Sequence, residues 1–131
     1  MSRSAIKLVY GLDAFPVLVT DRLALGVGAS TGGFTQVLLE RGAREVIALD
    51  VGHSQLVAQL RADDRVRIVE GVNARHLDAA GLAAASKTSE RPDRVVADVS
   101  FISLTTILPA IAATVAGDAD FLLLVKPRSS R

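Results

Sequence analysis

Short apolar runs alternate along this chain with segments whose apolar residues recur at helical spacing. The apolar runs are typical of buried strands and cover residues 23–27, 46–49, 66–69, 94–97 and 121–125. The helical patterns cover residues 4–15, a segment from Phe34 to a stop at Gly42, and residues 54–62, 74–85 and 103–116. Strands that are apolar throughout, each followed by a helix, predict a parallel sheet covered on both faces.

This order of elements predicts an α/β fold with a doubly wound, mostly parallel sheet, because crossovers between parallel strands are right-handed. We expect about five strands in the order 3-2-1-4-5, with helices on both faces. A length of 131 residues fits a single domain over residues 1–131. Pro109 lies inside the last helical pattern and predicts either a kink there or the true start of that helix.

Composition narrows the classes of protein that remain. Half of the residues are hydrophobic and the formal net charge is only +1, which excludes a disordered chain. The absence of cysteine excludes disulfides, thiol catalysis and cysteine-ligated zinc. Neither His53 nor His76 has a neighbour at metal-ligand spacing, so we expect no metal site. No apolar run approaches the roughly 18 residues of a membrane span, and we expect a cytoplasmic protein with no membrane partner.

A glycine-rich turn follows the first predicted strand and begins a helix. Its candidate ligand-binding residues are Gly28, Ala29, Ser30, Thr31, Gly32, Gly33 and Phe34. Unpaired backbone N–H groups at a helix N-terminus attract polar ligands, and glycine allows close approach to the backbone. The spacing departs from the dinucleotide fingerprint because threonine stands at position 31. A tight turn with a purely structural role is the alternative.

Polar residues also follow the second and third predicted strands. Asp50 lies 22 positions after Gly28, where an acid can accept hydrogen bonds from both hydroxyls of an adenosine ribose. Its alternative role is a helix cap. Asn73 could bond an adenine edge, although turn chemistry explains an asparagine there equally well.

Asp98 and Lys126 follow the fourth and fifth predicted strands. In the expected strand order these strands are neighbours, so both side chains can reach one crevice. A carboxylate and an ammonium group there suit proton abstraction and charge stabilisation. A plain ion pair at the sheet edge is the alternative.

Five segments together resemble the TlyA (hemolysin A) family over nearly the whole chain. They are Gly28-Ala-Ser-Thr-Gly-Gly-Phe34, Asp50-Val-Gly52, Asn73-Ala-Arg75, Val96-Ala-Asp-Val-Ser-Phe-Ile-Ser-Leu104 and Leu124-Val-Lys-Pro127. Members of this family are FtsJ-like, S-adenosylmethionine-dependent methyltransferases that modify ribose 2′-hydroxyls of ribosomal RNA. The resemblance implies a Rossmann-like methyltransferase fold, S-adenosylmethionine as cofactor and RNA as substrate and partner.

The resemblance also implies roles for individual residues. Its catalytic lysine–aspartate–lysine residues match Lys7, Asp98 and Lys126, and Lys7 lies in a matching Ser2-Arg-Ser-Ala-Ile-Lys-Leu8 stretch. Its cofactor contacts match the turn at 28–34, Asp50, Val51, Asn73 and Asp98. A lysine beside a ribose hydroxyl stabilises the developing alkoxide, or accepts the proton if its own pKa is depressed.

The chain departs from the family at several places, one of which is Ser4, where the family's Ser-Arg-Gly-Ala stretch has glycine. Gly26 stands where the family has an acid at the end of its first strand, the fourth catalytic residue (a glutamate) has no counterpart, and the C-terminal strands and N-terminal RNA-binding domain are missing. The alternative is therefore a truncated or degenerate, catalytically silent relative that binds cofactor or RNA, or pairs with another subunit. Residues 121–125 form an apolar edge strand, which predicts self-association.

Overall fold

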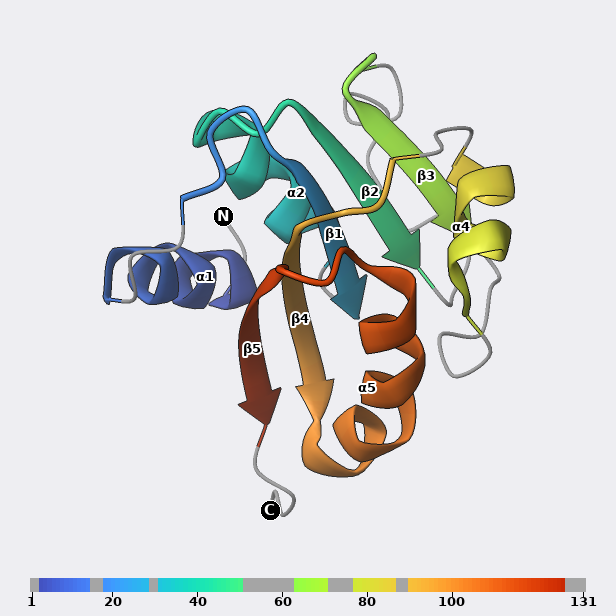
Figure 1. Ribbon diagram of the computed structural model, residues 1–131. Helices are drawn as coiled ribbons and strands as arrows, with labels where there is room; N and C mark the ends of the chain where they lie inside the picture. Colours follow the sequence, from blue (N-terminus) through green and yellow to red (C-terminus); the bar gives the residue numbers. More distant parts are fainter. Residues whose placement is uncertain are drawn as a thin grey trace.

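Five parallel strands form one continuous sheet at the centre of the molecule (Figure 1). The computed structural model describes residues 3–14, 18–28, 31–50, 63–70, 77–86 and 90–126. The strands are β1 (Leu23–Gly28), β2 (Glu45–Asp50), β3 (Val66–Glu70), β4 (Arg94–Ser100) and β5 (Asp120–Lys126). Their spatial order is β3-β2-β1-β4-β5, and every neighbouring pair is parallel. The predicted α/β class and strand order are therefore confirmed.

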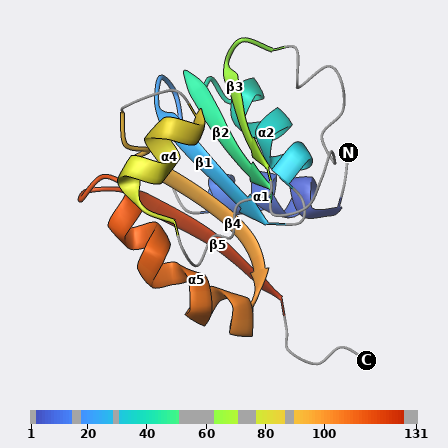
Figure 2. The same cartoon turned by 90° about the vertical axis from the view of Figure 1, so that its right-hand side faces the viewer.

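Helices cover both faces of this sheet, as Figure 2 shows from the side. The helices are α1 (Arg3–Ala14), α2 (Thr31–Glu40), α4 (Ala79–Ser86) and α5 (Phe101–Thr114). Helices α1 and α2 lie on one face, and α4 and α5 lie on the other. The helix predicted at 54–62 lies outside the described residues.

Strand alternation divides the core into two apolar clusters. Ala24, Val46 and Val96 pack with side chains of α1 and α2, whereas their sequence neighbours Leu25, Ile47 and others pack with α4 and α5. Successive side chains on a strand point to opposite faces, so a strand buried on both sides must be apolar at every position. This explains why the strands could be predicted as unbroken apolar runs.

Helix α1 approaches β5 closely at Gly11. A Cβ atom added at this glycine would lie 3.1 Å from Cδ2 of Leu122, which is 7% exposed in the core. Leu8, which is fully buried on the same helix, belongs to the same cluster as Leu122. The missing side chain of Gly11 thus allows α1 to pack directly against the last strand.

We expect Gly11→Val to lower the free energy of unfolding by about 1–3 kcal/mol, because the added methyl groups crowd Leu122. Urea unfolding of the variant and the parent protein measures this difference. Gly117→Val is the matched control, since a Cβ atom at Gly117 meets nothing within 4 Å. Equal losses at the two positions would show that the contact between α1 and β5 is not tight.

Three of the boundaries that differ from the predicted ones have a local reason. Strand β4 continues beyond Asp98 to Ser100, because β5 pairs with it along the whole of its length. Helix α5 therefore begins at Phe101, and Pro109 lies inside it rather than at its start. Helix α4 begins only after Asp78, whose carboxylate accepts a 2.6 Å hydrogen bond from the backbone N–H of Gly81 and caps the helix.

Among the described helices, none has both the length and the apolar character that crossing a bilayer requires.

Candidate functional site

Four of the predicted site residues have backbone positions at or near the carboxyl edge of the sheet. Gly28, Asp50 and Lys126 are the last residues of β1, β2 and β5, and Asp98 lies two residues before the end of β4. Since all the strands are parallel, these positions share one edge of the sheet. Ligands of open α/β sheets bind outside this edge, where the strand order reverses. Here the reversal lies at β1, between β2 and β4.

The strand register brings the predicted cofactor residues onto adjacent positions. Gly28 is the register partner of Asp98 on β4. On its other side, Val27 pairs with Leu49, so Gly28 and Asp50 are the next residues on their respective strands. Neighbouring strands lie about 4.8 Å apart. Gly28, where a ligand is expected to approach the backbone, therefore lies between an acid on each of the two flanking strands.

The predicted catalytic residues Asp98 and Lys126 occupy positions of β4 and β5 that belong to the same face of the sheet. Asp98 pairs with Leu124, and Lys126 lies two positions further along β5, opposite Ser100. Positions 98 and 126 thus continue the alternation of Val96 and Leu122, which pack on the face covered by α1 and α2. The side chains at positions 98 and 126 lie outside the described part of the structure.

Lys7 is carried by α1, which covers the same face of the sheet. Its neighbour Leu8 is fully buried in the cluster that contains Leu122 of β5. The backbone of Lys7 is therefore on the side of the sheet where positions 98 and 126 belong. The Lys7 side chain lies outside the described part, so convergence of the three side chains stays a prediction.

Helix α2 begins close to the end of β1, in the order the glycine-rich turn predicts. Thr31, Gly32 and Gly33 form its first turn, and no acidic residue occupies that turn. The first backbone N–H groups of a helix have no intrahelical acceptor and carry a partial positive charge. Ala29 and Ser30 of the turn, like Val51 and Asn73, lie outside the described residues.

Phe34 has a different environment from the rest of the glycine-rich segment. Its side chain is 0% exposed and packs in the cluster with residues of α1, β1 and β4. Any contact of Phe34 with a ligand would therefore have to come from its backbone. Its side chain instead anchors the start of α2 against the sheet.

Gly26, which replaces an acid of the TlyA family, is buried inside β1 rather than at the end of that strand. Its register partners are Ala48 and Val96, both fully or almost fully buried. Strand β1 continues to Gly28 because Gly28 still pairs with Asp98 of β4. The absence of an acid at position 26 leaves this part of the sheet apolar.

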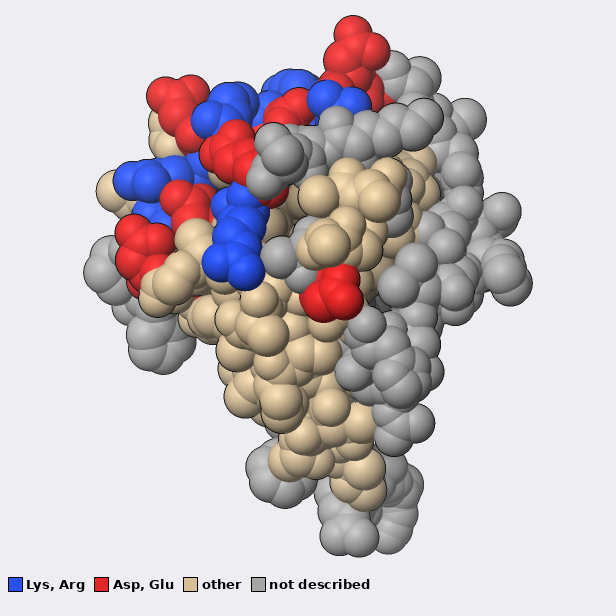
Figure 3. Space-filling model, turned by 45° about the vertical axis from the view of Figure 1, so that its right-hand side comes forward, with Lys and Arg blue, Asp and Glu red and all other residues tan. Residues whose placement is uncertain are grey.

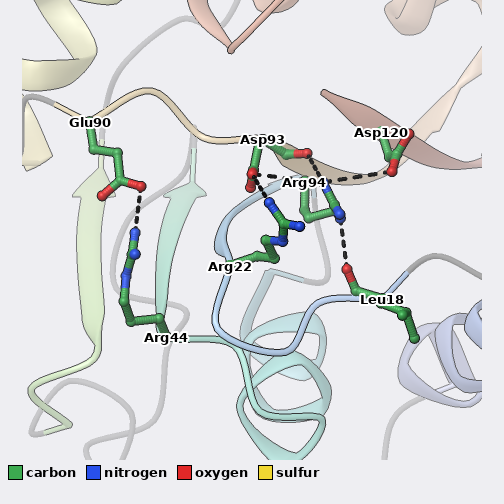
Figure 4. Close-up of polar contacts among 7 residues, drawn as sticks. All are labelled: Leu18, Arg22, Arg44, Glu90, Asp93, Arg94 and Asp120. Atoms are coloured by element: carbon green, nitrogen blue, oxygen red, sulfur yellow. Dashed lines mark hydrogen bonds and ion pairs between the residues drawn. The ribbon is translucent and has the colours of Figure 1, made fainter. Parts of the chain in front are cut away.

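Charged side chains gather at the opposite, amino edge of the sheet (Figure 4). Arg22 Nη1 donates to Asp93 Oδ2 at 2.9 Å. Arg94, the first residue of β4, lies 3.6 Å from the carboxylate of Asp120, the first residue of β5, and its Nε donates to the carbonyl of Leu18 at 2.7 Å. These contacts connect the entries of β1, β4 and β5.

A second pair lies beside this group. Arg44, directly before β2, donates to Glu90, and this hydrogen bond raises the pKa of the arginine above its ordinary value. Figure 3 shows basic and acidic side chains intermixed at this end of the molecule, while the surface over α5 carries no described charge. Exposed ion pairs of this kind add little to stability, and opposite charges that neutralise one another leave little net field for a ligand.

Sequence reasoning missed the amino-edge ion pairs, although a signal for them was present. Glu45, Arg94 and Asp120 are the first residues of three strands, so parallel pairing gathers them at one edge.

Among the described residues, no group of three or more His, Asp or Glu side chains could hold a metal ion.

Comparison with known proteins adds to this geometry. A family model described as FtsJ-like methyltransferase matches residues 1–129. The chain belongs to this family. The resemblance stated from the sequence motifs is therefore confirmed for the FtsJ-like domain.

Individual relatives of this FtsJ-like domain are similar over almost its whole length. The 16S/23S rRNA (cytidine-2′-O)-methyltransferase TlyA of Mycobacterium tuberculosis is 51% identical over 98% of this chain and 46% of its own length. Hemolysin A of Brachyspira hyodysenteriae is 41% identical over 98% of this chain and 51% of its own length. A solved structure described as a hemolysin from Streptococcus thermophilus superposes with a TM-score of 0.86 at 44% identity, covering 96% of this chain and 44% of that one.

The FtsJ-like chain thus spans about half the length of the curated relatives it matches. The structural match confirms the Rossmann-like methyltransferase fold of this half.

Proposed function

We propose that this FtsJ-like domain binds S-adenosylmethionine and transfers its methyl group to a ribose 2′-hydroxyl of ribosomal RNA. The observation that carries the proposal is the register at the carboxyl edge, where Gly28 lies between Asp50 and Asp98 on neighbouring strands. Relatives named as rRNA (cytidine-2′-O)-methyltransferases support the substrate class.

The donors and acceptors at this edge fit the cofactor. The first turn of α2, which begins three residues after Gly28, offers N–H groups without intrahelical acceptors, and Gly28 itself has no side chain to hinder approach to its backbone. Asp50, at the end of the adjacent strand, would accept hydrogen bonds from the two ribose hydroxyls. Residues Ala29 to Phe34, Val51 and Asn73 complete the proposed cofactor contacts. The bound cofactor supplies an activated methyl group on a sulfonium ion.

The catalytic work assigned to the chain is alignment and charge stabilisation. Lys126 and Lys7 would stabilise the negative charge that develops on the oxygen of the 2′-hydroxyl. If burial or the second cation lowers the pKa of one lysine, that lysine accepts the hydroxyl proton. Asp98, between Gly28 and Leu124 in register, would orient the lysines and face the cofactor.

Binding of the cofactor can be tested at Asp50 with a control on the same strand. We expect Asp50→Asn to weaken S-adenosylmethionine binding by about tenfold or more, because it removes a charge-assisted hydrogen-bond acceptor. Glu45→Gln makes the same change of charge at the opposite end of β2, where Glu45 pairs with Arg67 at 3.0 Å, and should leave the affinity unchanged. Isothermal calorimetry measures both, and equal affinities for the two variants would contradict a site at the carboxyl edge.

Methyl transfer is tested separately, with radiolabelled S-adenosylmethionine and bacterial ribosomal subunits. Incorporation of label into ribosomal RNA at a ribose 2′-oxygen is the expected result. Cofactor binding without incorporation would favour the alternative, a catalytically silent relative. No heat of binding at millimolar cofactor would contradict methyl transfer and would leave only a silent relative that does not bind the cofactor.

A further inference from the structure

Helix α1 and strand β5 carry the two lysines proposed for methyl transfer, and the helix meets the strand at a close contact. We propose that Gly11 is a positioning residue for this transfer, because its missing side chain sets the distance between the helix that carries Lys7 and the strand that carries Lys126. The inference rests on the proposed function and extends it to a residue that acts through the packing of α1.

The backbone at position 11 does not itself require glycine. Gly11 lies in the interior of α1, and positive φ occurs at Gly42 (92°) but not at Gly11. Glycine in a helix interior is unfavourable relative to alanine, because it loses more conformational freedom on folding. The physical reason for a glycine here therefore lies in the space around it.

The nearest neighbour of Gly11 is a single side chain on β5. A Cβ atom at position 11 would lie 3.1 Å from Cδ2, 3.4 Å from Cδ1 and 3.6 Å from Cγ of Leu122. Leu122 is itself buried, in one cluster with Leu8 of α1 and Val96 of β4. Because close-packed side chains have little room to move, a larger side chain at position 11 pushes α1 away from β5.

The contact belongs to the same side of each element as the two lysine positions. Lys7 lies four residues before Gly11 on α1, and helix positions four apart share one side. Lys126 lies four residues after Leu122 on β5, and strand positions an even number apart share one face. A shift of α1 away from β5 therefore separates positions 7 and 126.

A second contact holds α1 without fixing this distance. Arg41, directly after α2, lies with Nη2 2.9 Å from Oδ1 of Asp13 near the end of α1. Both side chains are partly exposed, and ion pairs of this kind add little and can adjust to a small displacement. The depth at which α1 lies against β5 is therefore set by Gly11 and Leu122.

Steady-state methyl transfer to ribosomal subunits tests the inference. We expect Gly11→Val to lower kcat about tenfold or more, since a misplacement of about 1 Å can cost on the order of 100-fold. The dissociation constant for S-adenosylmethionine should change less than about twofold, because the proposed cofactor residues lie outside α1 and β5. Gly117→Val, where a Cβ atom meets nothing within 4 Å, should keep the parental kcat.

A merely structural role of Gly11 would lower stability but leave the kcat of the folded protein unchanged. Circular dichroism therefore selects conditions in which each variant is folded. Leu122→Ala removes as many carbon atoms as Gly11→Val adds, so the double variant should recover most of the lost kcat. If the parent protein is active, an equal kcat in Gly11→Val, or a loss that Leu122→Ala does not reverse, would overturn this inference alone. No transfer by the parent protein would instead contradict the proposed function.

A second readout needs neither cofactor nor RNA. The chain contains no cysteine, so Lys7→Cys with Lys126→Cys places one thiol at each position. Methanethiosulfonate cross-linkers of graded length give the shortest span that joins the two thiols. We expect Gly11→Val to require a longer linker, and added Leu122→Ala to restore the shorter one. An unchanged shortest linker in Gly11→Val would overturn the inference, and thiols that no linker joins would overturn it together with the proposed convergence of the two lysines.

Discussion

Replacing Lys126 with alanine should lower the rate of methyl transfer by on the order of 10²- to 10⁴-fold, the usual contribution of one positioned acid–base group. Affinity for S-adenosylmethionine should stay close to that of the parent, because none of the proposed cofactor residues belongs to β5. A loss of kcat without a loss of binding would identify a group that acts on the reacting hydroxyl.

Two further variants separate the chemical role of Lys126 from its place at the end of β5. Lys126→Arg keeps the positive charge but cannot lose a proton near neutral pH, so partial activity would indicate charge stabilisation rather than proton abstraction. Asp120→Asn removes a charge at the opposite end of β5, beside Arg94, and should leave the rate unchanged. Full activity of Lys126→Ala would eliminate Lys126 as a catalytic residue.

Phe34→Ala should lower the free energy of unfolding by about 3–5 kcal/mol, the typical cost of truncating a buried aromatic side chain. Phe34 is 0% exposed and belongs to the cluster that joins α1, α2 and the sheet, so its loss leaves a cavity under the start of α2. Urea unfolding monitored by circular dichroism gives the difference.

The surface aromatic Tyr10 is the control for this measurement. It is 72% exposed on α1, and Tyr10→Ala should change stability by no more than about 0.5 kcal/mol. Phe34→Leu keeps an apolar side chain of intermediate size and should cost less than Phe34→Ala. A small effect of Phe34→Ala would indicate that the side chain of Phe34 is not a packing element and returns it to the list of ligand contacts.

The elements that could be predicted from the sequence are those whose burial produces a recognisable pattern of apolar residues along the chain. Strands β1 and β2 lie inside the sheet, and burial on both faces makes each an unbroken apolar run. Their order followed from right-handed crossovers. Gly28 and Asp50 could be placed at one edge because parallel strands end together.

Other features depend on contacts between distant segments, which no local pattern contains. Strand β4 extends to Ser100 because β5 pairs with it there, and the sequence signal of the strand fades at Asp98. The ion pair of Arg22 with Asp93 joins residues 71 positions apart. Whether the side chain of Lys7 meets those of Asp98 and Lys126 also depends on a contact between distant segments, namely the packing of α1 against the sheet.

The amino-edge ion pairs have a consequence for how this fold can be altered. Arg22 and Arg94 form ion pairs with acidic residues where the strands begin, at the amino edge of the sheet. The segments that follow the strands start from the opposite edge. Insertions or loop exchanges after β1, β2 or β4 should therefore leave these ion pairs intact. Loops at the carboxyl edge can therefore be exchanged to change ligand specificity while the sheet and the contacts at its amino edge stay the same.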